Sequence, residues 1–180
     1  MSKKPLNKIS GIKVFKRPVF KSNLGIFTET YKKEWLDNKF LQDSISISKK
    51  KGTIRGLHLQ NGKFSQGKLI TVFKGAIQDI FIDLRKDSDT FCYYGSLKIS
   101  ENNNNVLLVP RGFAHGFITL ESNTIVSYKL DNFYSPENEI TIRWNDPDLS
   151  VAWPKNFSYT LSRKDEEGIS LQEFISINKF

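Results

Sequence analysis

Short segments of alternating or β-branched residues, separated by turn-forming residues, constrain the fold of this chain most. Such segments, four to eight residues long, are typical of strands. The predicted strands cover residues 45–48, 68–73, 77–84, 96–100, 106–109 and 125–130. Turn signals between them include Asn61-Gly62, Lys74-Gly75 and Pro110-Arg111-Gly112. This spacing suits a sandwich or barrel better than alternating strands and helices, so we predict an antiparallel all-β core.

Two segments outside this core are expected to be helical. Residues 29–40 interleave three aromatic residues with Lys and Glu, a pattern that suits a short helix. Residues 162–174 begin with Ser162, and Asp165 would lie in the first turn, which is typical of a helix start. We therefore predict short helices on both flanks of the β core.

Length and composition indicate one domain. The chain has 180 residues, of which 38% are hydrophobic, and this is enough for a sizeable core. Cys92 is the only cysteine, so neither an intramolecular disulfide nor a cysteine-based zinc site is expected. The lysine-rich start lacks the apolar segment of a secretory signal, and no apolar run approaches the ~20 residues of a membrane span. We expect a soluble, cytoplasmic protein with no membrane partner.

The net charge of +8 does not by itself indicate a nucleic-acid partner. Lysines lie in short clusters at 3–4, 32–33 and 49–51, without one continuous basic segment. No helix-turn-helix, zinc-finger or RNP-type pattern accompanies the charge. A solvated basic surface is the first explanation and an anionic small ligand the second; we expect no nucleic-acid binding.

One of the chain's two histidines, His58, lies in the run RGLHLQ, ten residues before Lys68. Histidine changes its charge near neutral pH, so an imidazole held beside an ammonium is a candidate proton-transfer site. Taken alone, however, His58 would more often be a hydrogen-bonded strand histidine and Lys68 an ordinary surface lysine. Two isolated histidines do not supply the cluster that a cupin-type metal site needs, so no bound metal is expected.

Several strings add to this run and occur in a fixed order between residues 20 and 166. They are RGLHLQ at 55–60, QGKL at 66–69, DIFIDLR at 79–85, TF at 90–91, VPRGFAHGF at 109–117, YK at 128–129, YSP at 134–136, WNDP at 144–147 and LSRKD at 161–165. Each string alone is weak. Together, at near-matching spacing, they resemble the dTDP-4-dehydrorhamnose 3,5-epimerase family.

The resemblance implies a cupin-like jelly-roll β-sandwich that forms one domain over residues 1–180. Residues 1–45 would form an arm at a dimer interface, 45–155 the jelly-roll core and 156–180 a helical tail. The family usually forms homodimers that exchange N-terminal strands, so a homodimer is expected. The implied activity is that of an isomerase without metal or organic cofactor, acting on a nucleotide-linked 4-keto-6-deoxy sugar for surface polysaccharide biosynthesis.

Four side chains take the catalytic roles that the resemblance implies. A C4 ketone acidifies the hydrogens on C3 and C5, so inversion needs a base, an acid on the opposite face and a cation at the enolate oxygen. Carried over by motif, His58 would be the base, and Asp165 would hold its other ring nitrogen. Tyr128 would return the proton and Lys68 would stabilise the enolate. Without the resemblance, Tyr128 would be a core aromatic and Asp165 a helix-start acid.

Further residues are implied in substrate binding. Arg55 suits an anionic contact, because a guanidinium forks onto phosphate oxygens. Asp79 would orient Lys68 or tune its charge, and His115 matches a position lining the sugar pocket but equally suits a structural turn. The full predicted set, in which Phe27 and Glu29 bind the nucleotide base across the dimer interface, is Arg55, Phe27, Glu29, Gln42, His115, Tyr134 and Asp79.

The nucleotide side departs from the family pattern. Members that use dTDP sugars usually carry an Asp-x-Arg-Gly-x-Phe-x-Glu run, whereas residues 22–29 read SNLGIFTE, with Leu24 in place of the arginine. The loss removes a cation expected near the diphosphate. Our hypothesis from the sequence is a changed donor, for example a GDP- or CDP-linked 4-keto sugar such as a 6-deoxy-heptose.

Three other functions stay open at this point. Epimerisation at C3 alone and 3,4-ketoisomerisation are reactions of related jelly-roll enzymes on the same substrate class. An acid on the face opposite His58 favours epimerisation over isomerisation, because isomerisation can move a proton on one face. A non-catalytic sugar-nucleotide-binding module would have no use for the set of His58, Lys68, Tyr128 and Asp165.

Overall fold

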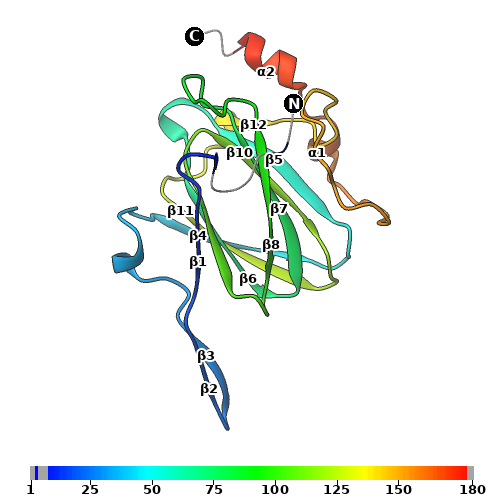
Figure 1. Cartoon of the computed structure of the whole chain (residues 1–180). Helices are drawn as coiled ribbons and strands as arrows, with labels where there is room; N and C mark the ends of the chain where they lie inside the picture. The colour runs from blue at the N-terminus through cyan, green and yellow to red at the C-terminus, as the bar shows by residue number, and fades with distance from the viewer. Residues whose placement is uncertain (1–2, 4–7, 178–180) are drawn as a thin grey trace.

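The strands pair into two five-stranded antiparallel sheets that pack face to face (Figure 1). The computed structural model describes residue 3 and residues 8–177. The first sheet has the order β1 (Lys13–Lys16), β9 (Asn105–Val109), β6 (Lys68–Lys74), β11 (Thr124–Leu130) and β4 (Gln42–Ser48). The second has the order β12 (Glu139–Thr141), β5 (Ile54–Gln60), β10 (Phe113–Thr119), β7 (Ala76–Asp83) and β8 (Tyr94–Ser100). From β4 to β12, every strand except β7 is followed by one in the other sheet, which is the winding of a jelly roll.

Apolar side chains fill two layers, one on each face of the second sheet. The layer between the sheets is built from both of them and includes Ile70, Phe81, Phe113, Phe117 and Val126. The outer layer lies under the C-terminal segment and includes Ile80, Ile82, Leu149, Trp153, Leu171 and Phe174. Because β7 and β10 are covered on both faces, nearly all of their residues are buried.

The antiparallel all-β prediction and its six strands are confirmed, since β4, β6, β7, β8, β9 and β11 coincide with the predicted segments. The helix predicted over residues 29–40 is wrong. Only a single 3-10 turn, η2 (Lys33–Trp35), forms there. The aromatic side chains instead pack from an irregular segment onto the outer face of the first sheet around Leu69 and Leu108, with Tyr31 and Phe40 in edge-to-face contact.

The helix predicted to begin at Ser162 is confirmed at its start and wrong in its length. The Ser162 hydroxyl accepts a hydrogen bond from the backbone amide of Asp165 and caps α1 (Arg163–Glu166). The chain then passes Gly168, where a side chain would meet the backbone of residues 142–143, before α2 (Leu171–Ile177) begins. Among the described residues, no helix has the length and apolar character needed to cross a membrane.

A hairpin of β2 (Val19–Ser22) and β3 (Gly25–Thr28) projects away from the sandwich (Figure 1). Its apolar side chains have no core to enter. Leu24, at the turn, is 93% exposed, and Phe27 is 67% exposed. The hairpin therefore presents an apolar surface outside the fold of the single chain.

The backbones of β5 and β10 approach closely at Gly56, next to His58. A Cβ atom on Gly56 would lie 2.6 Å from Gly116 Cα and 2.8 Å from the His115 carbonyl oxygen. Gly25 has a similar backbone angle, with φ of +130° against +122° for Gly56, but open space around it. The two positions therefore share backbone strain and differ in packing.

We predict that Gly56→Ala destabilises the protein more than Gly25→Ala. Both variants carry the strain of a side chain at positive φ, and Gly56→Ala adds an overpacking cost of about 1–3 kcal/mol. Urea unfolding followed by circular dichroism measures both losses. Equal losses in the two variants would show that the β5–β10 approach does not constrain the fold.

Candidate active site

A pocket of about 330 Å³ opens between the two sheets and beside α1. It brings together six residues that the sequence analysis selected from distant positions: Arg55, His58, Lys68, His115, Tyr128 and Asp165. Ser46, Phe117, Ser162 and Lys164 complete the lining. The four predicted catalytic side chains therefore face one space.

The two walls of the pocket follow from strand register. In the second sheet, His58 of β5 lies directly opposite His115 of β10. In the first sheet, Tyr128 of β11 pairs with Ile70, two residues along β6 from Lys68. Side chains alternate along a strand, so Tyr128 and Lys68 point to the same face. His58 thus comes from one sheet, and Tyr128 with Lys68 from the other.

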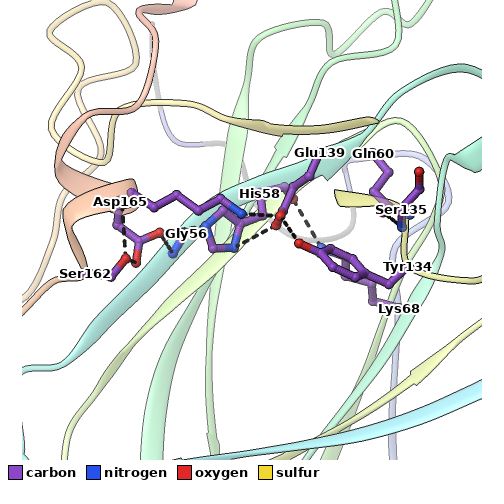
Figure 2. A network of polar contacts seen from close by, with 10 residues as sticks. Gly56, His58, Gln60, Lys68, Tyr134, Ser135, Glu139, Ser162 and Asp165 are labelled. Carbon is purple, nitrogen blue, oxygen red and sulfur yellow. Dashed lines mark hydrogen bonds and ion pairs between the residues drawn. The ribbon is translucent and has the colours of Figure 1, made fainter. Parts of the chain in front are cut away.

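His58 and Asp165 form a short polar contact in the pocket (Figure 2). Nε2 of His58 lies 2.6 Å from Oδ1 of Asp165, which also accepts a hydrogen bond from the Gly56 amide, while Oδ2 accepts one from the Ser162 hydroxyl. Burial opposes ionisation of Asp165, but these hydrogen bonds outweigh it and hold its pKa below the usual range. Asp165 is therefore a carboxylate that fixes Nε2, and Nδ1 is left to exchange a proton.

Lys68 lies behind His58, and its Nζ donates a hydrogen bond of 3.2 Å to the His58 carbonyl oxygen. Burial lowers the pKa of Lys68 to about 8, although the carboxylates of Glu139 and Asp79 favour its charged form. The amine is thus an ammonium at neutral pH and titrates within the range in which most enzymes are assayed.

Tyr128 is partly buried on the wall that faces His58. Its ring lies 6.5 Å from that of His115 and 6.4 Å from that of Phe117, between centroids. Burial raises the pKa of Tyr128 well above its ordinary value. The phenol therefore stays protonated and can donate a hydrogen bond, or its proton to a strongly basic carbanion, opposite a histidine that can act as a base.

Glu139 and Lys164 belong to the site but were not predicted. Glu139, at the start of β12, accepts hydrogen bonds from Lys164 Nζ and, at 2.6 Å, from the Tyr134 hydroxyl, and its Oε1 lies 3.8 Å from Nδ1 of His58 (Figure 2). Burial works against the Glu139 charge, yet hydrogen bonds from Lys164 and Tyr134 hold its pKa below normal. The hydrogen bond to Glu139 raises the pKa of Tyr134 to about 12. Lys164 could have been predicted, because it adjoins Asp165 in the sequence. Glu139 could not, because it reaches the site only through the pairing of β12 with β5.

The other predicted binding residues divide into two groups. Gln42 and Asp79 lie next to the site: Gln42 accepts a hydrogen bond from the Tyr134 amide, and Asp79 contacts His115 beneath the pocket. Phe27 and Glu29 are not brought to it. Phe27 is on the projecting hairpin, and Glu29 pairs with Lys32 at 2.8 Å.

Acid–base groups, not metal ligands, dominate this region. Across residue 3 and residues 8–177, no three His, Cys, Asp or Glu side chains are arranged to hold a metal ion. The pocket has a carboxylate-held imidazole on one wall, and a protonated phenol and an ammonium on the other. This arrangement can remove a proton from one face of a carbon and return one to the other face.

Comparison with known proteins agrees with this chemistry. The family model described as dTDP-4-dehydrorhamnose 3,5-epimerase matches residues 7–173. The chain belongs to this family. Its members are cofactor-independent isomerases with a cupin-type fold, so the predicted fold class and enzyme class are confirmed.

Three relatives illustrate the match. A dTDP-4-dehydrorhamnose 3,5-epimerase from Sinorhizobium fredii is 39% identical over 170 residues, covering 92% of this chain and 87% of its own. The crystal structure of the epimerase from Bacillus anthracis, with TDP and PPi bound, is 44% identical, has a TM-score of 0.86, and the match covers 90% of this chain and 95% of that one. The Legionella pneumophila enzyme in complex with dTDP-4-keto-L-rhamnose is 33% identical, with a TM-score of 0.86 and coverage of 92% and 90%.

These relatives do not support the GDP- or CDP-linked donor that was predicted from Leu24. Their names and bound molecules refer to thymidine nucleotides. The side chain of Leu24 lies exposed at the tip of the hairpin and does not line the pocket of its own chain. Its change leaves the described pocket intact.

We predict that Lys68 titrates near pH 8 in the free protein, because burial destabilises its ammonium form. Protein labelled with lysine ¹³C at the ε position permits the measurement by NMR, and Lys68→Met assigns the signal by its loss. A midpoint at the ordinary lysine value of about 10.4 would contradict the buried environment.

Proposed function

We propose that the chain epimerises C3 and C5 of a dTDP-linked 4-keto-6-deoxy sugar through enolate intermediates. The observation that carries this proposal is the placement of a carboxylate-held histidine and a protonated tyrosine on opposite walls of one pocket. Inversion at carbon requires this two-sided arrangement, whereas proton movement along one face does not.

In the proposed first step, Nδ1 of His58 takes the proton from the carbon next to the C4 ketone. The electron pair of the broken C–H bond forms a double bond between that carbon and C4, and the π electrons of the C4 carbonyl move onto its oxygen, giving an enolate. Asp165, bound to Nε2, stabilises the imidazolium that forms. Lys68, protonated below about pH 8, offers its ammonium to the enolate oxygen.

In the second step, Tyr128 gives its proton to the opposite face of the same carbon. The enolate collapses to the ketone, and the configuration at that carbon is inverted. The imidazolium then loses its proton, the phenolate regains one, and both exchanges proceed through solvent. Each inversion therefore brings one solvent-derived hydrogen into the sugar.

The thymidine donor is supported by the relatives, which carry TDP or a dTDP-linked keto sugar. Arg55 lines the pocket, and its Nε donates a hydrogen bond to the Ser48 hydroxyl at 3.4 Å. A guanidinium held in this way is suited to a diphosphate oxygen. We assign Arg55 to the anionic part of the substrate.

We predict that the wild-type protein, incubated in D2O with a dTDP-linked 4-keto-6-deoxyglucose, places deuterium at both C3 and C5. Proton NMR of the sugar follows each carbon. His58→Asn should lose nearly all exchange, with a decrease on the order of 10³-fold or more, because it removes the base. Tyr128→Phe should keep proton abstraction and lose inversion.

The same experiment separates the alternatives. Exchange at C3 alone would identify a C3 epimerase, and transfer of the ketone to C3 would identify a ketoisomerase. Binding without exchange would leave a sugar-nucleotide-binding module. GDP- and CDP-linked substrates serve as controls, and preference for either would overturn the thymidine assignment. Circular dichroism verifies that each variant is folded.

We further propose that the protein is a homodimer in which the β2–β3 hairpin reaches the pocket of the partner chain. The hairpin exposes Phe20, Ile26 and Phe27, and β4 adds Ile45 and Ile47 on the outside of the first sheet. Exposed apolar patches of this kind mark interaction surfaces. Phe27 and Glu29, outside the pocket of their own chain, would then contact the nucleotide base bound by the other.

We predict that two inactive variants complement each other in a heterodimer. One chain carries His58→Asn, and the other carries Phe27→Ala with Glu29→Ala. If the hairpin acts on the partner, one of the two sites combines an intact His58 with an intact hairpin. Purified heterodimers, isolated through two different tags, should then recover about half of the wild-type activity.

The reciprocal control places all three substitutions in one chain and pairs it with wild type. This heterodimer should be inactive, because each of its sites lacks either the base or the hairpin. Half activity in the control, with none in the first heterodimer, would show that the hairpin acts within its own chain. A monomer by light scattering would overturn the dimer itself.

A further inference from the structure

A second histidine–aspartate pair, which is buried, consists of His115 in the lining of the pocket and Asp79 behind it, and neither residue takes part in the proposed proton transfers. Oδ2 of Asp79 is 2.9 Å from Nε2 of His115, and the two residues are 0% and 3% exposed. Register explains the contact: Asp79 of β7 lies opposite Phe117 of β10, and His115 is two residues along the same face. The register of β7 and β10 therefore brings the two side chains together.

The other oxygen of Asp79 has no partner. Oδ1 is buried and, among the described residues, receives no hydrogen bond. A buried carboxylate with an unpaired oxygen is costly, and burial raises the pKa of Asp79, while His115 and, more weakly, Lys68 favour its charged form. The charge of Asp79 thus depends on these two neighbours.

Lys68 has a corresponding need. Burial disfavours its ammonium, and among the described carboxylates Glu139 and Asp79 counter that effect. Glu139 already accepts hydrogen bonds from Lys164 and Tyr134. Oδ1 of Asp79, in contrast, accepts none from the described residues. Asp79 is therefore the carboxylate whose charge is least committed elsewhere.

The remaining titratable side chains that line the pocket with Lys68 come from four other elements. They are His58 and Arg55 of β5, His115 of β10, Tyr128 of β11, and Lys164 and Asp165 of α1. The oxygens of Asp165 are already engaged by His58, the Gly56 amide and the Ser162 hydroxyl, and Arg55 and Lys164 are cations that disfavour a further positive charge. Near Lys68, Asp79 is thus the carboxylate with an oxygen that no described group hydrogen-bonds.

We propose that Asp79 and His115 are positioning residues for Lys68: His115 keeps the buried Asp79 carboxyl ionised, and that carboxylate keeps Lys68 protonated at the place of the enolate oxygen. The inference rests on the proposed epimerase function and deepens it. His115 then acts through Asp79, and its contact with the sugar is a separate matter.

Lys68 acts as an ammonium, so activity falls as pH rises through its pKa. Asp79→Asn removes the favourable anion and should lower the Lys68 pKa from about 8 to about 7. His115→Leu should act in the same direction, because Asp79 loses its hydrogen-bond donor and becomes neutral more readily. His115→Gln keeps a donor and should restore much of the wild-type value.

The experiment measures Lys68 in the ligand-free protein by ¹³Cε NMR, and then the alkaline limb of kcat/KM for the same variants. Asp83→Asn is the matched control: Asp83 is also buried in β7 but pairs with Arg85, so its loss affects stability without changing the charge near Lys68. We expect the Lys68 midpoint and the alkaline limb of kcat/KM to shift together to lower pH in Asp79→Asn and His115→Leu. In Asp83→Asn both should keep their wild-type values. In the double variant, His115→Leu should add little to Asp79→Asn.

An unchanged Lys68 midpoint in Asp79→Asn and His115→Leu would overturn the proposal, as would an equal change in Asp83→Asn. His115→Gln provides a folded variant if Asp79→Asn does not fold, and a midpoint as low as that of His115→Leu would also count against the proposal. The NMR measurement needs no substrate. A lowered midpoint in a protein without exchange activity would therefore support the coupling and overturn only the epimerase assignment.

Discussion

The contact between His58 and Asp165 is the interaction on which the rest of the site depends. It joins β5 to the first turn of α1 across 107 residues of sequence. Asp165 receives the Gly56 amide and the Ser162 hydroxyl as well, so one carboxylate orients the imidazole, supports the strand that carries it and completes the helix cap. The C-terminal segment can close the pocket only if it returns over the second sheet, where Trp153, Leu171 and Phe174 bury the outer apolar layer. Packing of the C-terminal segment therefore also positions Asp165 and, through it, orients His58.

The jelly roll separates the chemical roles by placing them on different sheets. Strands that follow each other in sequence alternate between the sheets, so β5 brings His58 to one wall, and β6 and β11 bring Lys68 and Tyr128 to the other. Their environments then set their protonation. Hydrogen bonds keep Asp165 ionised, burial keeps Tyr128 protonated, and burial leaves Lys68 within reach of deprotonation. Groups whose environments push their pKa values apart can serve as base, acid and cation at the same pH.

The sequence predicted those parts of this arrangement that have a local signal. Alternation located six strands, and Ser162 with Asp165 located the start of α1. Periodicity did not identify β5 and β10 as strands. Most of their residues are buried, so hydrophobicity does not alternate along them, and Gly56 and Gly116 interrupt them. The predicted helix at 29–40 failed because its aromatic residues pack onto a sheet that no local pattern reveals. In the site, the order of motifs selected six pocket residues, whereas Glu139 enters only through the pairing of a three-residue strand.

The hairpin that carries Leu24 and Phe27 is physically independent of the catalytic walls. It shares no sheet with β5, β6, β10 or β11, and its apolar side chains are exposed in the single chain. A substitution there changes no side chain that holds His58, Lys68 or Tyr128 in place. The loss of a cation at Leu24 can therefore alter how a nucleotide is held without altering proton transfer, and for this reason the composition of the hairpin is a poor guide to the reaction. The walls of the pocket are a better guide to the reaction, because they must hold a base, an acid and an ammonium around one space.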